Sequence, residues 1–170
     1  LPTTRHELCD AYIEASKEAG LPLNPVFNGT SQEGTGYYES THLNGIRYST
    51  ATSYLRTARK RSNLRIVSHA LVVKVLLDGK RAVGIAYERN GQALELRARR
   101  EVILSAGAIA TPQLLEWSGV GDGERLRELG IPVAHHSPNV GERLQDHLQI
   151  RTVYESKTEN TLNARYNNPL

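Results

Sequence analysis

Residues 101–121 read EVILSAGAIATPQLLEWSGVG, and this stretch gives the strongest signal for the architecture. It begins with a continuous apolar run, Val102 to Leu104, and then drops to small residues at Ser105–Ala108. A continuous apolar run is typical of a strand that is covered on both faces, as in a parallel sheet. The stretch therefore predicts a buried strand over residues 101–105.

A helix is predicted directly after the small residues. Thr111 is a suitable N-cap, Pro112 suits the first helical position, and Gly119 suits the end of the helix. The side chains expected to be buried are Leu114, Leu115 and Trp117. Ligands bind at the carboxyl ends of strands in such sheets, where small residues let them approach the main chain. Tight packing of strand against helix explains the small residues equally well, and both interpretations stay open.

The residues before this stretch predict a three-stranded antiparallel meander. Residues 71–77 are apolar and rich in β-branched side chains, and residues 81–88 and 93–98 alternate as half-buried strands do. Asp78-Gly79 and Asn90-Gly91 between them are typical hairpin turns. Residues 64–69 are predicted to be a further strand, because they are apolar and rich in β-branched side chains.

The remaining segments predict two helices, a long loop and one more strand. Residues 3–19 form a helix with a capping box of Thr4 and Glu7, and residues 50–61 form a shorter one with Tyr54 facing inward. Residues 21–49 are interrupted repeatedly by glycine, so we expect them to pack on another part of the protein or to line a site. Residues 149–154 alternate as a strand does.

Composition excludes several classes of protein. The chain has 170 residues with a net charge of +3, and no apolar run approaches the length of about 20 residues that a membrane span needs. The basic cluster at 56–61 lacks interleaved aromatic residues, so we expect no nucleic-acid partner. The single cysteine, Cys9, favours a reducing compartment. A cytoplasmic location is expected, with peripheral association at a membrane as the alternative.

Common catalytic and binding motifs are missing. Gly119, Gly121 and Gly123 follow a helix, whereas a dinucleotide fingerprint follows a strand, so we interpret them as a helix end and a turn. The six histidines lack metal-ligand spacing, and no Gly-x-Ser-x-Gly nucleophile motif occurs. From the residues alone no catalytic side chain and no metal site is predicted.

Residues 107–121 resemble the second signature of the glucose–methanol–choline oxidoreductases, which are flavoenzymes that oxidise alcohols with FAD. Further segments that resemble the family are Asn28–Gly34, Asn44–Leu55, Asn63–Leu64, Ala82–Gly84, Gly130–Pro132 and Val140–His147. The resemblance implies an α/β chain that is the middle part of an FAD/NAD(P)-binding-type domain with an antiparallel three-stranded meander, plus the first strand of a substrate domain. Residues 1–148 would belong to the FAD-binding domain and 149–170 to the substrate-binding domain.

The resemblance also implies which residues bind the cofactor. The main chain at Val72 would contact the adenine of FAD, and Ser105, Ala106 and Gly107 would pass near its adenosine part. The family's glycine-rich phosphate-binding segment lies upstream of such a region and its catalytic histidine lies downstream. The chain has no methionine with which to begin, so we expect it to be an internal fragment, inactive alone, whose partner is the remainder of the flavoenzyme.

The expected reaction is FAD-dependent oxidation of a primary alcohol to the aldehyde. Choline-oxidising relatives tend to have a glutamate where this chain has Gln149, so the resemblance favours a less charged small-molecule alcohol over choline. Choline dehydrogenase proper is one alternative. The alternative from another class is a non-catalytic binding module that has kept the fold, which a stop codon near Leu170 and the lack of an upstream half would support.

Overall fold

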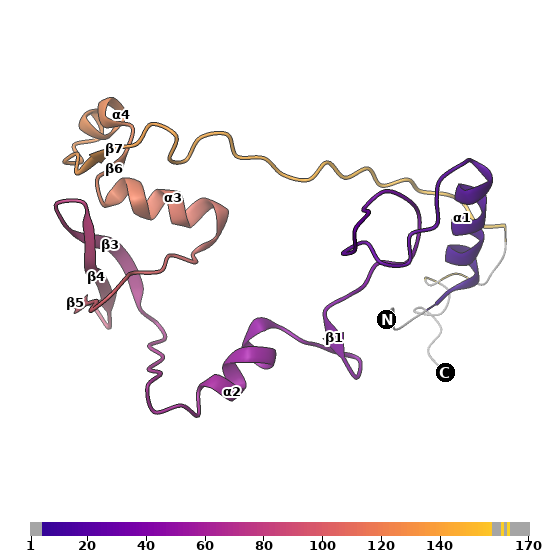
Figure 1. Ribbon diagram of the computed structural model, residues 1–170, viewed down its shortest axis with the longest axis horizontal. Coiled ribbons are helices and arrows are strands. Elements are labelled where there is room, and N and C mark those ends of the chain that lie inside the picture. Colours follow the sequence, from indigo (N-terminus) through magenta and orange to yellow (C-terminus); the bar gives the residue numbers. More distant parts are fainter. Residues whose placement is uncertain (1–4, 158–160, 162, 164–170) are drawn as a thin grey trace. The chain divides into compact units, whose positions relative to one another are not determined.

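The computed structural model describes residues 5–157, 161 and 163 (Figure 1). The chain divides into two compact units, of which one comprises residues 1–65 and 151–170 and the other residues 66–150. The assignment of 1–148 and 149–170 to two functional domains is a different division and stays a prediction.

The first unit contains short elements and one longer helix. They are α1 (Glu7–Glu18), β1 (His42–Leu43), β2 (Ile46–Arg47), the π-helical turn η1 (Ala51–Leu55) and α2 (Arg56–Ala58). α1 begins later than predicted, because the N-cap is His6, whose Nδ1 accepts the Leu8 N–H at 3.2 Å. Thr4 of the predicted capping box lies outside the described residues.

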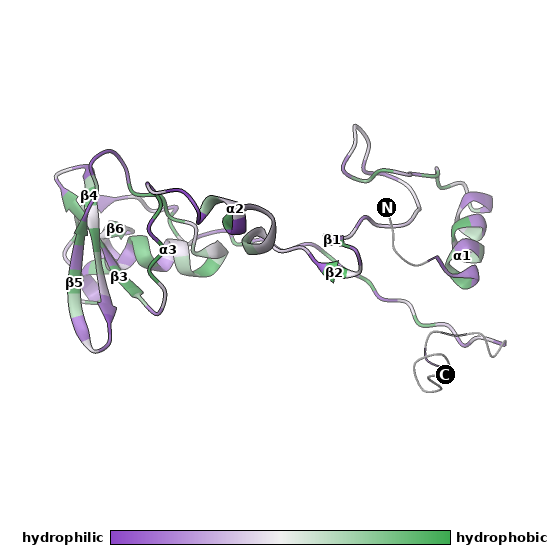
Figure 2. Ribbon diagram, turned by 90° about the horizontal axis from the view of Figure 1, so that it is seen from below, coloured by the Kyte–Doolittle hydropathy of each residue, from purple (hydrophilic) through white to green (hydrophobic). Residues whose placement is uncertain are grey.

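The apolar faces of these helices are not buried within the unit. Hydrophobic and hydrophilic residues alternate along α1 (Figure 2), yet its only buried residue among those described is Ser16. Tyr54, predicted to face inward, has 75% of its surface exposed, and this prediction is wrong. Amphipathic spacing selects a helix face, but burial requires an element that packs on that face.

The glycine-rich segment after α1 is organised around one buried side chain. Asn24 donates its amide hydrogens to the main-chain oxygens of Ser31 and Glu33, and its Oδ1 accepts the Val26 N–H. Its main-chain N–H donates to the Thr35 carbonyl at 2.8 Å. Residues 24–35 therefore form a compact loop that satisfies its own main chain.

The second unit contains the predicted meander. β3 (Leu71–Asp78), β4 (Arg81–Arg89) and β5 (Gln92–Arg97) form an antiparallel sheet in that order. The β4–β5 turn has φ of +51° at Asn90 and +72° at Gly91, as a two-residue hairpin of the expected type requires. The α/β class and the meander are confirmed.

Three predicted strands are not formed. Residues 64–69, 101–105 and 149–154 are neither helix nor strand. A strand exists only when its main chain pairs with a neighbour, and no other segment of the described chain pairs with these residues. Apolar side chains in all three stay exposed, such as Ile66 at 51%, Ile103 at 77% and Val153 at 93%.

The helix after the small residues is α3 (Gly107–Trp117), and its first residue comes five positions before Pro112, the predicted first helical residue. Gly107 has φ of +91°, which lets the chain turn directly from Ala106 into the helix. Thr111 is therefore inside the helix, and its Oγ1 accepts the Ala106 N–H at 3.1 Å. Leu114 is buried as predicted, whereas Trp117 is 47% exposed and was wrongly placed in the core.

A small parallel unit follows α3. It consists of β6 (Val120–Gly121), α4 (Gly123–Glu128) and β7 (His135–His136), with β6 and β7 paired in parallel. Gly119 ends α3 with φ of +86°, as predicted, and a side chain there would overlap the Pro132 carbonyl. The chain can return past α3 so closely only because this position is glycine.

The core of the second unit is formed by residues of β3, α3 and α4. Val75, Leu114 and Leu126 are its buried hydrophobic residues. Within it, the hydroxyl of Ser118 accepts the Val75 N–H at 2.8 Å and donates to the Leu114 carbonyl at 2.6 Å. A buried N–H at the edge of β3 is thereby satisfied by the helix.

Candidate functional site

The candidate site is the turn at Ser105–Gly107, where the chain enters α3 (Figure 1). All three residues are exposed. A Cβ added to Gly107 would meet no atom within 4 Å, so the space beside this main chain is open. The N-cap, Ala106, has no side-chain acceptor for the first N–H groups of the helix. The turn therefore presents main-chain donors at the positive end of a helix dipole.

Val72 lies on β3, which is an edge strand of the sheet. It is half-buried and pairs with Tyr87, and the register shifts between Val72 and Lys74, as at a β-bulge. Bulges interrupt the regular hydrogen-bond ladder and change the direction of the main-chain groups next to them. The structure thus places all four predicted residues in the second unit, one on β3 and three at the start of the helix that packs on β3.

A shallow, open hollow of 490 Å³ lies where β3 begins and β4 ends, next to Leu71, which precedes Val72 in the chain. It is lined by His69, Ala70, Leu71 and residues 88–91. Sequence reasoning missed this hollow, because it predicted a strand up to His69, where the chain instead turns with φ of +54°. That turn lies immediately before β3.

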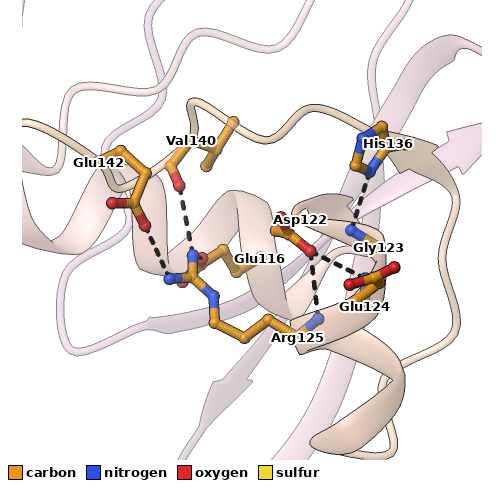
Figure 3. Close-up of polar contacts among 8 residues, drawn as sticks. All are labelled: Glu116, Asp122, Gly123, Glu124, Arg125, His136, Val140 and Glu142. Atoms are coloured by element: carbon orange, nitrogen blue, oxygen red, sulfur yellow. Dashed lines mark hydrogen bonds and ion pairs between the residues drawn. The ribbon is translucent and has the colours of Figure 1, made fainter.

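A cluster of charged residues lies at the C-terminal end of α3 (Figure 3). The Arg125 guanidinium, on α4, contacts Glu116 of α3 and donates to Glu142 Oε1 at 2.9 Å. The hydrogen bond with Glu142 and the charge of Glu116 raise the pKa of Arg125 above its ordinary value. Sequence reasoning missed this cluster, since its members are far apart along the chain and have no characteristic spacing.

The start of α4 is capped from two directions (Figure 3). Asp122 Oδ1 accepts the N–H groups of Glu124 at 2.9 Å and Arg125 at 3.2 Å, and His136 Nδ1 accepts the Gly123 N–H at 3.0 Å. The hydrogen bonds from Arg125 and Glu124 lower the pKa of Asp122. The glycines at 119–123 therefore belong to a helix end, a short strand and a helix start. The helix end was predicted from the sequence, whereas the strand β6 stands where a turn was expected.

Neither a metal cluster nor a membrane span is found in the part of the chain that the structure describes. No group of three or more His, Cys, Asp or Glu side chains there is placed to hold a metal ion. None of the described helices combines the length and hydrophobicity that crossing a bilayer requires.

Two oxidoreductases are among the solved structures to which this chain is similar. Pyridoxine 4-oxidase from Mesorbium loti matches with a TM-score of 0.69 and 26% identity, over 82% of this chain and 27% of that one. An FAD-dependent oxidoreductase from Chaetomium thermophilum matches with a TM-score of 0.67 and 27% identity, over 81% of this chain and 24% of that one.

The family model for GMC oxidoreductases matches residues 2–149, so the chain belongs to the GMC oxidoreductase family. It is 53% identical over 153 residues to oxygen-dependent choline dehydrogenase 1 of Chromohalobacter salexigens, covering 89% of this chain and 27% of that protein. It is 49% identical over 147 residues to human mitochondrial choline dehydrogenase, covering 86% of this chain and 25% of that protein. The chain thus spans about a quarter of the length of the curated relatives that it matches.

The pKa of Asp122 generates a prediction about stability in acid. Because this pKa is lowered in the folded protein, the carboxylate stabilises the fold above the unfolded-state value of about 3.9. The contribution is lost as the pH falls through the lower folded-state pKa. Asp122→Asn keeps an acceptor without the charge, so wild type should be more stable than this variant near neutral pH and lose that advantage in acid. Urea unfolding measured across the acid range checks this, and a difference independent of pH would contradict it.

Proposed function

We propose that the complete polypeptide containing this chain is an FAD-dependent oxidoreductase that converts a primary alcohol to the aldehyde. The observation that carries the proposal is the exposed small-residue turn at Ser105–Gly107, in a chain of the GMC oxidoreductase family. One structural neighbour is itself described as FAD-dependent. These residues would contribute to FAD binding, and the catalytic base would lie elsewhere in the polypeptide.

The residues present are compatible with the adenosine half of FAD. Gly107 leaves open space beside the main chain, and Ala106 adds only a methyl group. The N-cap side chain accepts none of the first N–H groups of α3, and these groups can donate to hydroxyl or ring nitrogen acceptors. Val72 would contribute through its main chain, next to Leu71, which helps to line the open hollow. When bound, FAD supplies the hydride acceptor of the reaction.

The domain assignment forms part of the proposal. Residues 1–148 would be the middle of the FAD-binding domain and 149–170 the start of the substrate-binding domain. The 170 residues alone would then bind FAD weakly and catalyse nothing, since the phosphate-binding segment and the base lie outside them. The location would be cytoplasmic or peripheral at a membrane.

A second candidate function is oxidation of choline itself. Relatives that are 49–53% identical to this chain are named choline dehydrogenases, which favours it. The neutral Gln149 favours a less charged alcohol, because a carboxylate would attract a quaternary ammonium. The two candidates differ in substrate and share the same cofactor.

Gly107→Val tests the cofactor site. A β-branched residue at φ of +91° is strained, and its side chain would fill the open space beside the turn. We expect FAD binding to the complete protein to weaken by about tenfold or more, measured as flavin content and dissociation constant. Gly130→Val is the matched control, since Gly130 has φ of +71° and equally open surroundings away from the turn. Equal FAD binding by the two variants would contradict the proposal.

Steady-state rates separate the two candidate substrates. If Gln149 sets the preference, wild type should have a higher kcat/KM for uncharged primary alcohols than for choline. Gln149→Glu should then raise kcat/KM for choline about fivefold through attraction of the cation. Gln92→Glu, with the same change of charge on β5, is the control. A clear wild-type preference for choline would instead establish the second candidate, and a complete protein that oxidises no alcohol would favour a non-catalytic module.

A further inference from the structure

Arg125 joins three separate pieces of the second unit. Its guanidinium contacts Glu116 at the end of α3, donates to Glu142 at 2.9 Å and reaches the Val140 carbonyl at 3.4 Å (Figure 3). The planar guanidinium can donate to several acceptors in fixed directions. Arg125 therefore attaches the turn at 139–142 to the two helices.

The chain changes direction immediately after this attachment. Arg143 has φ of +56°, a conformation that is unfavourable for a residue with a Cβ. Such a conformation persists only when the surrounding structure holds it in place. Two neighbouring main-chain bonds, from Val140 N to Ser137 O at 3.2 Å and from Glu142 N to Asn139 O at 3.3 Å, close the turn but do not tie it to a helix. The side chains of Glu142 and Arg125 make that tie.

The residues that follow have no regular structure to direct them. Residues 142–156 are neither helix nor strand, and Leu148 is 91% exposed. The Asp146 carboxylate accepts the N–H of its neighbour His147 at 2.8 Å, which is a local bond. The path of residues 143–150 away from the helices therefore begins at the turn that the Arg125–Glu142 contact holds.

We propose that Arg125 is a positioning residue, which bridges Glu116 and Glu142 and thereby fixes the path of residues 143–150. The inference rests on the proposed function, in which these residues lead from the FAD-binding part to the substrate-binding part. Arg125 would hold the end of the FAD-binding part in place, so that residues 143–150 leave it along one path. Its effect on catalysis would be indirect.

The exposure of the cluster determines what an experiment should show. Arg125, Glu116 and Glu142 have side-chain exposures of 41%, 24% and 49%. Ion pairs exposed to this extent contribute little to global stability. If Arg125 is a positioning residue, removing its contacts should accelerate hydrogen exchange only in residues 143–150. If its role is generally structural, exchange should accelerate throughout the second unit.

The test compares Arg125→Gln, Glu142→Gln and Arg125→Lys in the complete protein, with Arg127→Gln as the control. Arg127 lies on the same helix, and its side chain forms no ion pair with the described residues. Hydrogen exchange of residues 143–150 and tryptic cleavage after Arg143 report on the segment. Both Gln variants should accelerate exchange and cleavage there by about three- to tenfold, Arg125→Lys should do so less, and Arg127→Gln should match wild type.

Activity provides the second measurement. The Gln variants should lower kcat/KM for the alcohol while FAD content stays at the wild-type level. Unchanged exchange in 143–150 would overturn the inference, and so would acceleration that extends equally over β3–β5. If wild type oxidises no alcohol, the proposed function fails, but the exchange and cleavage measurements still decide whether Arg125 directs this segment.

Discussion

The second unit depends on the hydroxyl of Ser118. This side chain is buried with Val75 and Leu114, accepts the N–H at the edge of β3 and donates to the last turn of α3. An edge strand that packs against a helix leaves main-chain groups away from water, and each such group needs a partner. One hydroxyl supplies the partner and fixes the distance between helix and sheet. The position of the small-residue turn at the other end of α3 follows from this attachment.

Both ends of α3 can then be understood together. Its C-terminal end is held by Ser118 on one side and by the Glu116–Arg125 contact on another. At its N-terminal end the side chain of the N-cap, Ala106, makes no hydrogen bond, and Gly107 leaves the space beside it open. A helix that is fixed at one end and accessible at the other can present its first N–H groups in a constant position. This is the property that the proposed contact with the adenosine half of FAD requires.

The sequence predicted those features that depend on neighbouring residues. Asn90-Gly91 specified its hairpin because both residues readily adopt positive φ, and Gly119 specified the end of α3 for the same reason. Pairing between distant segments was harder to predict. Val102–Leu104 has the composition of a central strand, but strand formation depends on a partner that no local pattern reveals. The start of α3 was misplaced because Pro112 suits a first turn, although here it lies within the helix. Arg125, Glu116 and Glu142 meet only through the tertiary fold, so their spacing gave no signal.

Hydrogen exchange at the Val75 amide, in wild type and Ser118→Ala, tests the role of Ser118 most directly. Removing the hydroxyl leaves a buried N–H without its acceptor, which should reduce the free energy of unfolding by about 1–3 kcal/mol. The Val75 amide should exchange faster in Ser118→Ala than in wild type. Ser68 is an exposed serine of the same unit, and the free energy of unfolding of Ser68→Ala should stay within about 0.5 kcal/mol of the wild-type value. Unchanged Val75 exchange and a stability equal to that of Ser68→Ala would contradict the account.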